Sequence, residues 1–489
     1  MAITLTIFIV IAPVPCYSDN NAFLAPPGAG ITADSLQAHP YLSRTVSKRV
    51  KLRSVKRTGA VIVPGKSDGF MGIKFVLNAG LLVKDGIRAL AARLTTRIVD
   101  YGLHLRRSNI GLVVHRNLNS KKSDGRVSTP TGMPVTMIGE IDLIDLNMLD
   151  PDDMNLTQDK SKSIYLEAHE RYMNAVSADE TLYWTAQMEW ADGQRIIALE
   201  DARIVERDGI INIFLTVVKK NGSWYSAVTT HNTESFMRNI KKKMDNPDDS
   251  IAWNFTPLKK LINDGPCADQ NIKNFVPFGN PANGKWYALY RPEDKKNTTI
   301  RLAVSETGLA GDWKDDGLYM EMDKKKDENE KDAWIGVSSF IAGPQEGPYE
   351  FMLMHTARDV QKSKLKNPKN YDLWLIIADR KNPKKFVTVP IMKAESGQPF
   401  EKEAGCWYPG AIYSCGAVLK SFNIENGEYV FDIYYSGSDT AILLAEVSLG
   451  IPDDIFSSET IPSSEKFADA VRNGTVHRKK NNKACDRSS

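Results

Sequence analysis

Two acids and an arginine stand together at Glu200, Asp201 and Arg203, between two runs of β-forming apolar residues. These runs predict short strands at Ile196–Leu199 and Ile210–Val218, with the acids at the edge of the first strand. A carboxyl group beside a second carboxyl and a guanidinium can be held in one defined protonation state, as acid–base catalysis requires. The alternative interpretation is a solvated salt bridge at a turn.

The composition excludes some partners. The chain has 489 residues, of which 42% are hydrophobic and 25% are charged, and its net charge is +3. These values are typical of a globular protein and give no reason to expect nucleic acid or an anionic membrane as a partner. Short basic runs, such as Lys241–Lys243, are read as solvated faces.

The N-terminus predicts export. Residues 1–18 contain an apolar run, Ala2–Pro13, that is too short for a membrane span and similar to the core of a secretory leader, although no Lys or Arg precedes it. Cys16 could instead carry a lipid, but the Val-Pro before it fits that signal poorly. Residues 19–56 are expected to form an arm and residues 456–489 a polar tail.

The cysteines do not suggest a metal site. No C-x-x-C or H-x-x-x-H spacing occurs, so neither a metal nor an organic cofactor is indicated. Cys406 and Cys415 are close enough in sequence to pair in an oxidising compartment, and the sequence leaves this open.

A strand–turn–strand pattern recurs about five times. The turns carry D-G or N-G, and strands follow each other closely, as in antiparallel hairpins. The units contain Asn78–Thr96, Ala202–Val217, Asn283–Ser305, Tyr349–Ala378 and Asn426–Val447. Radial repetition of small sheets predicts an all-β fold, a five-bladed β-propeller over residues 57–455. Helices are expected only in insertions: Lys162–Ala178 within a long insertion at 117–180, and a short helix at Met237–Met244.

Polar residues recur at equivalent points of these units. A lone Asn, Arg or His in a strand is usually a satisfied structural residue. The first strand of each propeller blade lines the central channel, so repetition in five units predicts that these residues lie on first strands and converge on one mouth. The candidates are Asn78, Arg93, Asp201, Arg203, Asn274, Arg291, His355, Tyr371 and Asp439. A carboxylic acid surrounded by cations suits acid-assisted displacement at a sugar carbon.

The succession of motifs resembles glycoside hydrolase family 130, five-bladed propeller enzymes that act on β-mannosides. The resemblance runs from about Asn78 to Val447 and excludes the insertions. It is carried by Leu199-Glu-Asp-Ala-Arg203, Asp269-Gln-Asn-Ile-Lys-Asn274, Trp286-Tyr-Ala-Leu-Tyr-Arg291-Pro292, Phe351-Met-Leu-Met-His355, Tyr371-Asp-Leu-Trp and Tyr434-Tyr-Ser-Gly-Ser-Asp439.

The resemblance implies a role for each candidate. Asp201 matches the catalytic acid, and Arg291, His355 and Tyr371 match the places where phosphorolytic members bind inorganic phosphate. The mannosyl ring would be held by Asn78, Arg93, Glu200, Arg203, Asn274 and Asp439. Phosphate would then attack the anomeric carbon with inversion and give α-mannose 1-phosphate.

Some residues depart from the family pattern. The usual E-D-P-R is replaced by Glu-Asp-Ala-Arg, a mild change because proline only stiffens the turn. The lysine expected in the fourth blade is not evident around Trp334-Ile-Gly336, which weakens the case for phosphate. Glu346 and Glu350 are candidate bases for a hydrolase that activates water, or exposed acids of a Gly/Pro loop.

The leading hypothesis is therefore an inverting β-mannoside phosphorylase whose substrates are a β-mannoside oligosaccharide and phosphate. An exported protein would meet little phosphate, so a secreted β-mannoside hydrolase is the runner-up, and a β-mannosyltransferase shares the fold. A glycan-binding propeller without activity is the non-enzymatic alternative. The long insertion could shape acceptor subsites or an oligomer contact.

Overall fold

The computed structural model describes 17 separate stretches of the chain. They are residues 45–62, 75–98, 105–115, 132–136, 196–219, 223–246, 251, 255–256, 258–264, 271–278, 284–293, 299–322, 330–344, 347–360, 369–402, 408–423 and 425–456. Among these residues no helix is long and apolar enough to cross a membrane. The predicted leader, the helix expected at Lys162–Ala178 and the C-terminal tail beyond residue 456 lie outside the described residues.

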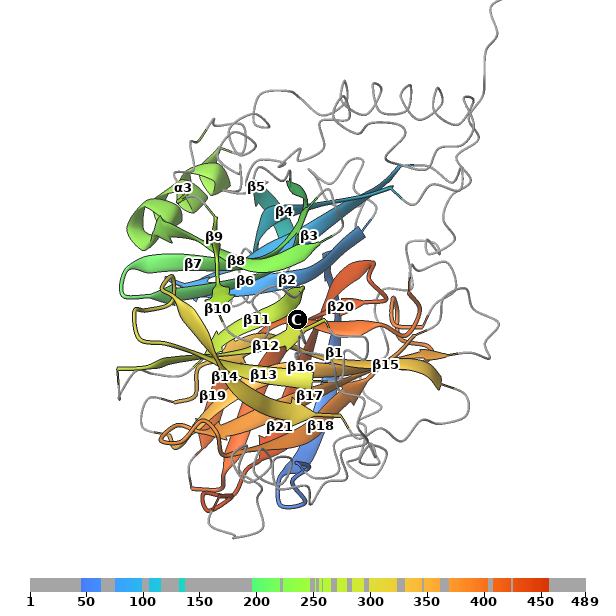
Figure 1. Cartoon of the computed structure of the whole chain (residues 1–489). Coiled ribbons are helices and arrows are strands. Elements are labelled where there is room, and N and C mark those ends of the chain that lie inside the picture. The colour runs from blue at the N-terminus through green and yellow to red at the C-terminus, as the bar shows by residue number, and fades with distance from the viewer. Residues whose placement is uncertain are drawn as a thin grey trace, which may run out of the picture.

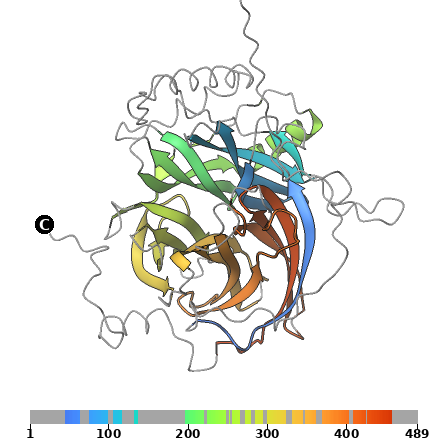
Figure 2. The same ribbon diagram turned by 90° about the vertical axis from the view of Figure 1, so that its right-hand side faces the viewer.

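Five small sheets follow one another around a central axis, so the predicted five-bladed β-propeller is confirmed (Figures 1 and 2). The strands of each blade follow one another from the axis outward.

The first blade is β2 (Phe75–Lys84), β3 (Ile87–Ile98), β4 (Leu105–His115) and β5 (Gly132–Thr136). The second is β6 (Ile196–Arg207), β7 (Ile210–Lys219), β8 (Trp224–Asn232) and β9 (Lys259–Lys260). The third is β11 (Ile272–Phe278), β12 (Trp286–Pro292), β13 (Thr299–Ser305) and β14 (Trp313–Glu321), with β10 (Ile262–Asp264) added parallel to β14. The fourth is β15 (Glu330–Ile341), β16 (Tyr349–Val360), β17 (Lys369–Asp379) and β18 (Phe386–Lys393). The fifth is β19 (Ile412–Asn423), β20 (Glu428–Gly437), β21 (Ala441–Gly450) and β1 (Lys51–Ile62).

The ring is closed by the N-terminal strand. β1 pairs antiparallel with β21 and forms the outer edge of the fifth blade, beside the last strands of the chain (Figure 2). A buried ion pair supports the closure, because Arg57 on β1 places its Nε 2.7 Å from Oε1 of Glu401. Since β1 begins at Lys51, the propeller includes the last residues of the expected arm.

Apolar side chains fill each of the five gaps between neighbouring blades. Between the fourth and fifth blades, for example, Leu353 and Leu375 pack in one cluster with Phe431 and Leu443. The other four clusters join the remaining pairs of adjacent sheets. Each fully buried aliphatic side chain contributes about 1.5–3 kcal/mol, so these clusters hold neighbouring blades together.

The described helix, α3 (Thr233–Asp245), follows the third strand of the second blade (Figure 1). Asn232 caps it by accepting a 3.0 Å hydrogen bond from the backbone N–H of Ser235. Phe236 and Ile240, four residues apart, are buried in the cluster between the first and second blades. The helix expected at Met237–Met244 is thus confirmed and starts four residues earlier.

The inner strand of every blade carries a β-bulge. The registers shift between Leu77 and Gly80, Glu200 and Arg203, Lys273 and Val276, Val337 and Ser339, and Ser414 and Gly416. In three blades the bulge holds an Asn or Asp in the left-handed region: Asn78 at φ 45°, Asp201 at φ 53° and Asn274 at φ 55°. These are the non-glycine residue types that adopt this region most readily. Bulges re-aim side chains, and here they direct polar groups toward one mouth.

Candidate active site

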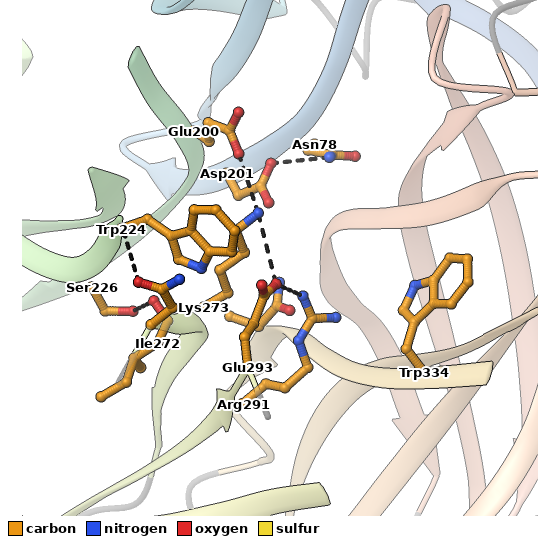
Figure 3. A network of polar contacts seen from close by, with 12 residues as sticks. Asn78, Glu200, Asp201, Trp224, Ser226, Ile272, Lys273, Arg291, Glu293 and Trp334 are labelled. Atoms are coloured by element: carbon orange, nitrogen blue, oxygen red, sulfur yellow. Dashed lines mark hydrogen bonds and ion pairs between the residues drawn. The ribbon is translucent and has the colours of Figure 1, made fainter. Parts of the chain in front are cut away.

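Asp201 lies at the meeting point of the first two blades (Figure 3). Its Oδ1 accepts a hydrogen bond of 3.0 Å from Nδ2 of Asn78 and one of 3.3 Å from Nη1 of Arg93. Only 9% of its side chain is exposed. The inner strands can approach this closely because Gly80 has no side chain: a Cβ there would lie 2.7 Å from the carbonyl oxygen of Ala202.

A chain of alternating charges runs from Asp201 through Arg93 into the third blade, and Figure 3 draws the part of it from Glu200 to Arg291. Arg93 also donates to Glu200 at 2.6 Å, and Nζ of Lys273 lies 3.7 Å from the other oxygen of Glu200. The same Nζ lies 3.8 Å from Oε1 of Glu293, to which Arg291 donates at 2.7 Å. The paired charges hold each other in place across three blades.

The protonation state of Asp201 results from two opposed effects. Burial favours the neutral acid, but the charges of Arg93, Arg203 and Lys273, with the hydrogen bond from Asn78, outweigh it and hold the pKa of Asp201 below its ordinary value. The carboxyl is therefore ionised at neutral pH in the unliganded protein. Its proton affinity depends on how much positive charge surrounds it.

The buried side chain of Tyr413 extends the site toward the fifth blade. Arg203 donates to the hydroxyl of Tyr413, and Nδ2 of Asn274 donates to the same hydroxyl at 2.7 Å. The Tyr413 ring lies 4.6 Å from the ring of His355, centroid to centroid. Four blades thus contribute to the site around Tyr413. The second, third and fifth do so from their inner strands, and the fourth from its second strand.

His355 is a neutral imidazole. Burial, followed by the charges of Arg291 and Arg203, lowers the pKa of His355 to about 3. Space for the ring exists because its neighbour in the sheet is Gly336, where a Cβ would lie 2.6 Å from Cε1 of His355 and 2.8 Å from Oδ1 of Asn274. A neutral imidazole in this position can donate one hydrogen bond and accept another.

Tyr371 and Asp439 complete the mouth. The Tyr371 ring stacks on His355 at 5.4 Å, and its hydroxyl accepts a 3.2 Å hydrogen bond from Nε1 of Trp334. Burial and then the Asp439 carboxylate raise the pKa of Tyr371 well above its ordinary value. Asp439 also acts on Arg93, whose pKa is raised despite burial. With φ of 50°, Asp439 occupies the turn between β20 and β21.

Several buried polar atoms around this centre have no partner among the described residues. They are Oδ1 of Asn78, Oδ1 of Asn274, Nδ1 of His355, Nε of Arg203 and Nε of Arg291. Buried polar atoms are normally hydrogen-bonded, so a cluster of exceptions marks a place built for a polar ligand. Acceptors and donors are both present, as a polyhydroxylated molecule requires.

The structure brings the predicted site residues together but corrects their positions. They were expected on the first strands of the blades, which holds for Asn78, Glu200, Asp201, Arg203 and Asn274. The others lie on β3 (Arg93), β12 (Arg291), β16 (His355), β17 (Tyr371) and the β20–β21 turn (Asp439). β6 also continues through Glu200–Arg203 to Arg207, so the acids occupy a bulge within the strand and not its edge.

One predicted acid is elsewhere. Glu350 pairs with Ala378 at the end of β16 remote from His355, is buried, and forms an ion pair of 3.6 Å with Arg380. Burial raises its pKa, although Arg380 and Arg207 oppose this. Glu350 therefore cannot serve as a base at this mouth, and Glu346 lies outside the described residues.

Sequence reasoning missed Lys273, Glu293, Tyr413 and Trp334. Lys273 precedes the left-handed Asn274 just as Glu200 precedes the left-handed Asp201, so the repeated bulge was a usable signal. Tyr413 belongs to β19, a strand that the local sequence pattern did not indicate. Glu293 directly follows β12, and only the pairing of Lys273 with Arg291 in the β11–β12 register reveals that it lies near Lys273.

The described residues contain no group of three His, Cys, Asp or Glu side chains that could hold a metal ion. Cys415 is a buried free thiol within the fifth blade, and burial raises its pKa to about 12. Cys406 lies outside the described residues.

Solved structures with a similar fold include three enzymes that act on mannosides. A β-1,2-mannobiose phosphorylase from Listeria innocua is 14% identical, with a TM-score of 0.46 over 79% of this chain and 94% of that chain. The chain is similar to proteins of glycoside hydrolase family 130. A structure from that family of mannoside phosphorylases, which contains hydrolases of β-1,2 mannosidic linkages in Candida mannan, is 15% identical, with a TM-score of 0.44 over 84% of this chain and 95% of that chain. A mannose phosphorylase from Leishmania mexicana in complex with phosphate is 11% identical, with a TM-score of 0.42 over 80% and 88%.

No family model and no curated protein matches the chain. At these identities, the function rests on the geometry of the chain's own side chains.

Proposed function

We propose that the chain is an inverting glycoside phosphorylase that transfers a β-mannosyl group from a β-mannoside to inorganic phosphate. The observation that carries the proposal is the convergence of one carboxyl, Asp201, whose side chain is 9% exposed, with two buried arginines, Arg203 and Arg291, around unpartnered polar atoms. A buried acid can protonate a leaving oxygen, and buried guanidinium groups bind an anionic nucleophile.

In the proposed reaction, a phosphate oxygen forms a bond to the anomeric carbon on the face opposite the leaving group. The bond from that carbon to the leaving oxygen breaks, and the proton of Asp201 passes to this oxygen. The products are α-mannose 1-phosphate and the shortened sugar. Because phosphate is itself the nucleophile, the protein supplies no base.

The binding roles follow from the chemistry of each side chain. Asn78 and Asn274 offer amide oxygens to sugar hydroxyls, while Arg93 and Asp439 lie beside the same centre. Arg291, neutral His355 and Tyr371 form the wall proposed for phosphate. Glu200 holds Arg93 and Lys273 by charge, and Arg203, which acts on His355 together with Arg291, adds positive charge beside the phosphate wall.

The lowered pKa of Asp201 is consistent with this cycle. Burial alone favours the protonated acid, and only the surrounding cations keep it ionised. A phosphate bound near Arg203 and Arg291 neutralises part of that positive charge. Binding of the nucleophile therefore favours the protonated form of Asp201 that the reaction needs.

A β-mannoside hydrolase is the second candidate because of Glu293. An inverting hydrolase needs a second carboxylate to activate water. Glu293 lies beside the proposed phosphate wall and occupies one donor of Arg291 at 2.7 Å. In this alternative Glu293 would be the base, and phosphate would have no role.

The test combines product analysis with one variant. The protein is incubated with β-1,2- and β-1,4-linked mannobiose, with and without phosphate, and mannose 1-phosphate and free mannose are measured. Mannose 1-phosphate formed only with phosphate, and retained in Glu293→Gln, supports the phosphorylase. Free mannose without phosphate, lost in Glu293→Gln, supports the hydrolase. Binding without turnover under any condition contradicts both and favours a glycan-binding propeller.

A further inference from the structure

A carboxylate stands among the cations of the proposed phosphate wall. Oε1 of Glu293 accepts a hydrogen bond of 2.7 Å from Nη2 of Arg291 and lies 3.8 Å from Nζ of Lys273 (Figure 3). Only 15% of the Glu293 side chain and 9% of the Arg291 side chain are exposed. A site for an anionic nucleophile therefore contains a fixed negative charge, although like charges repel each other strongly where water is excluded.

The position of Glu293 is fixed by its backbone and by Lys273. Its N–H donates to the carbonyl of Asn271 at 2.7 Å, and the Asn271 side chain accepts a hydrogen bond of 3.0 Å from the backbone N–H of Trp224. The Lys273 ammonium, in turn, lies 4.5 Å from the centroid of a Trp224 ring. Glu293 is thus held at both its backbone and its side-chain end.

Hydrogen-bonding capacity remains on both Glu293 and Arg291. The two cations make their closest contacts with Oε1 of Glu293, and its Oε2 has no partner among the residues that the structure describes. On Arg291, Nη1 is 3.5 Å from the carbonyl oxygen of Ile335, and the buried Nε has no partner in the same set of residues. A guanidinium carries its N–H donors in one plane, so an anion bound to the remaining donors of Arg291 can bring an oxygen toward Oε2 of Glu293.

The Glu293 carboxylate can accept a hydrogen bond from a bound anion but cannot donate one. It can therefore bind only an anion that carries a proton. Inorganic phosphate keeps at least one proton at neutral pH, whereas sulfate, which has the same tetrahedral shape, keeps none. The donors of Arg291, Tyr371 and His355 together with an acceptor on Glu293 match protonated phosphate, and they leave sulfate facing a like charge.

We propose that Glu293 selects protonated phosphate and rejects sulfate, because it accepts a hydrogen bond from the P–OH group of the bound phosphate. This inference rests on the proposed function and names the residue that makes the anion site specific for the nucleophile. A buried acceptor of this kind rejects a similar ligand that lacks the proton. The proton stays on the phosphate while another oxygen attacks the anomeric carbon, so the bonds made and broken in the proposed reaction do not change.

The test compares phosphate with sulfate in the wild type and in Glu293→Gln. During phosphorolysis of mannobiose at neutral pH, KM for phosphate and the inhibition constant of sodium sulfate are measured. Isothermal titration calorimetry with each salt, with and without mannose, gives the binding constants without turnover. We expect the wild type to bind phosphate about a hundredfold more tightly than sulfate. In Glu293→Gln, whose neutral amide can donate to sulfate, this ratio should fall about tenfold or more.

A matched control is Glu350→Gln. Glu350 also forms a buried ion pair with an arginine, Arg380 at 3.6 Å, but at the end of β16 remote from His355. The ratio should keep its wild-type value in this variant. Glu293→Asp keeps the charge on a shorter side chain, so it should discriminate against sulfate more strongly than Glu293→Gln does.

The outcomes separate this inference from the proposed reaction. If Glu293→Gln changes the affinities for phosphate and sulfate by the same factor, Glu293 only offsets positive charge, and the inference is wrong while the phosphorylase stands. A wild type that binds the two anions equally also overturns it. If the wild type forms no mannose 1-phosphate yet prefers phosphate over sulfate, and Glu293→Gln loses this preference, the selection is supported and the reaction fails. Binding of neither anion to the wild type overturns the inference, and product analysis then decides the reaction on its own.

Discussion

Asn78 and Asp201 lie in different blades, share the rare left-handed backbone conformation, and are joined by a hydrogen bond of 3.0 Å. The same bulge occurs in both inner strands, so each side chain is turned toward the other across the gap between the blades. The pair ties the candidate acid to the neighbouring blade. Its position depends on the assembled ring and not on one strand.

Replacement of Asp201 by Asn removes the transferable proton while keeping the shape. We expect turnover of mannobiose to fall about 10²- to 10⁴-fold, the usual contribution of a positioned acid. Hydrolysis or phosphorolysis of β-mannosyl fluoride should fall much less, because fluoride leaves without a proton. Steady-state kinetics with both donors and calorimetric binding of mannobiose check this. Undiminished turnover of mannobiose would remove Asp201 from the role of acid.

Replacement of Arg291 by Ala should weaken phosphate binding. The guanidinium is buried beside neutral His355, so its loss should raise KM for phosphate about tenfold to a hundredfold. Arg301→Ala is a matched control in the same blade, since Arg301 also forms an ion pair, with Asp315. Phosphate kinetics at saturating mannobiose give the measurement. Equal KM values for phosphate in wild type and Arg291→Ala would contradict the assignment.

The buried neutral His355 should make the protein acid-sensitive. Its pKa is lowered from 6.5 to about 3 on folding, so between these values the unfolded chain binds a proton that the folded chain does not. Stability is therefore unaffected above pH 6.5 and decreases as pH falls, by about 2 kcal/mol at pH 5 for this group. His355→Gln should show a smaller decrease between pH 7 and pH 5 in chemical denaturation. Identical decreases in both proteins would show that His355 does not titrate in this way.

Arg57 and Glu401 should contribute to the free energy of unfolding in a strongly coupled way. Glu401 is fully buried and accepts hydrogen bonds from Arg57 at 2.7 Å and from the Tyr435 hydroxyl at 2.8 Å. Its backbone oxygen also accepts from Gly410 and from the hydroxyl of Ser438, beside Asp439. Arg57→Ala leaves a buried carboxylate without its cation and should cost about 3–5 kcal/mol of stability.

A double-mutant cycle checks this coupling. Because Met at both positions removes the two charges together, the double variant Arg57→Met/Glu401→Met should be more stable than either single variant. Urea denaturation gives the free energies of unfolding. Additive losses in the double variant would refute the coupling of β1 to the loop that holds the Asp439 turn.

The amino-acid sequence by itself determined the local part of this protein. Hairpins such as β2–β3 and β6–β7 follow from alternating apolar residues and from turns such as Asp85-Gly86 and Asp208-Gly209, because strand pairing across a short turn is a local interaction. The residue types at Asn78, Asp201 and Asn274 also follow, since Asn and Asp tolerate the left-handed bulge. The sequence therefore indicated the candidate residues, because they recur at equivalent points of the strand–turn–strand units.

The tertiary structure decided where those residues meet. Strand register brings Arg93, Arg291 and His355 to the site from the second strands of their blades. It places Glu350 at the far end of β16. It also brings Lys273 and Glu293 into the site. The inner strands β15 and β19 and the closing strand β1 were not evident from local pattern, because each is defined by partners distant in sequence. The same reason explains the protonation of the site: burial and two cations from other strands, Arg93 and Lys273, act on Asp201 only once the blades have closed around it.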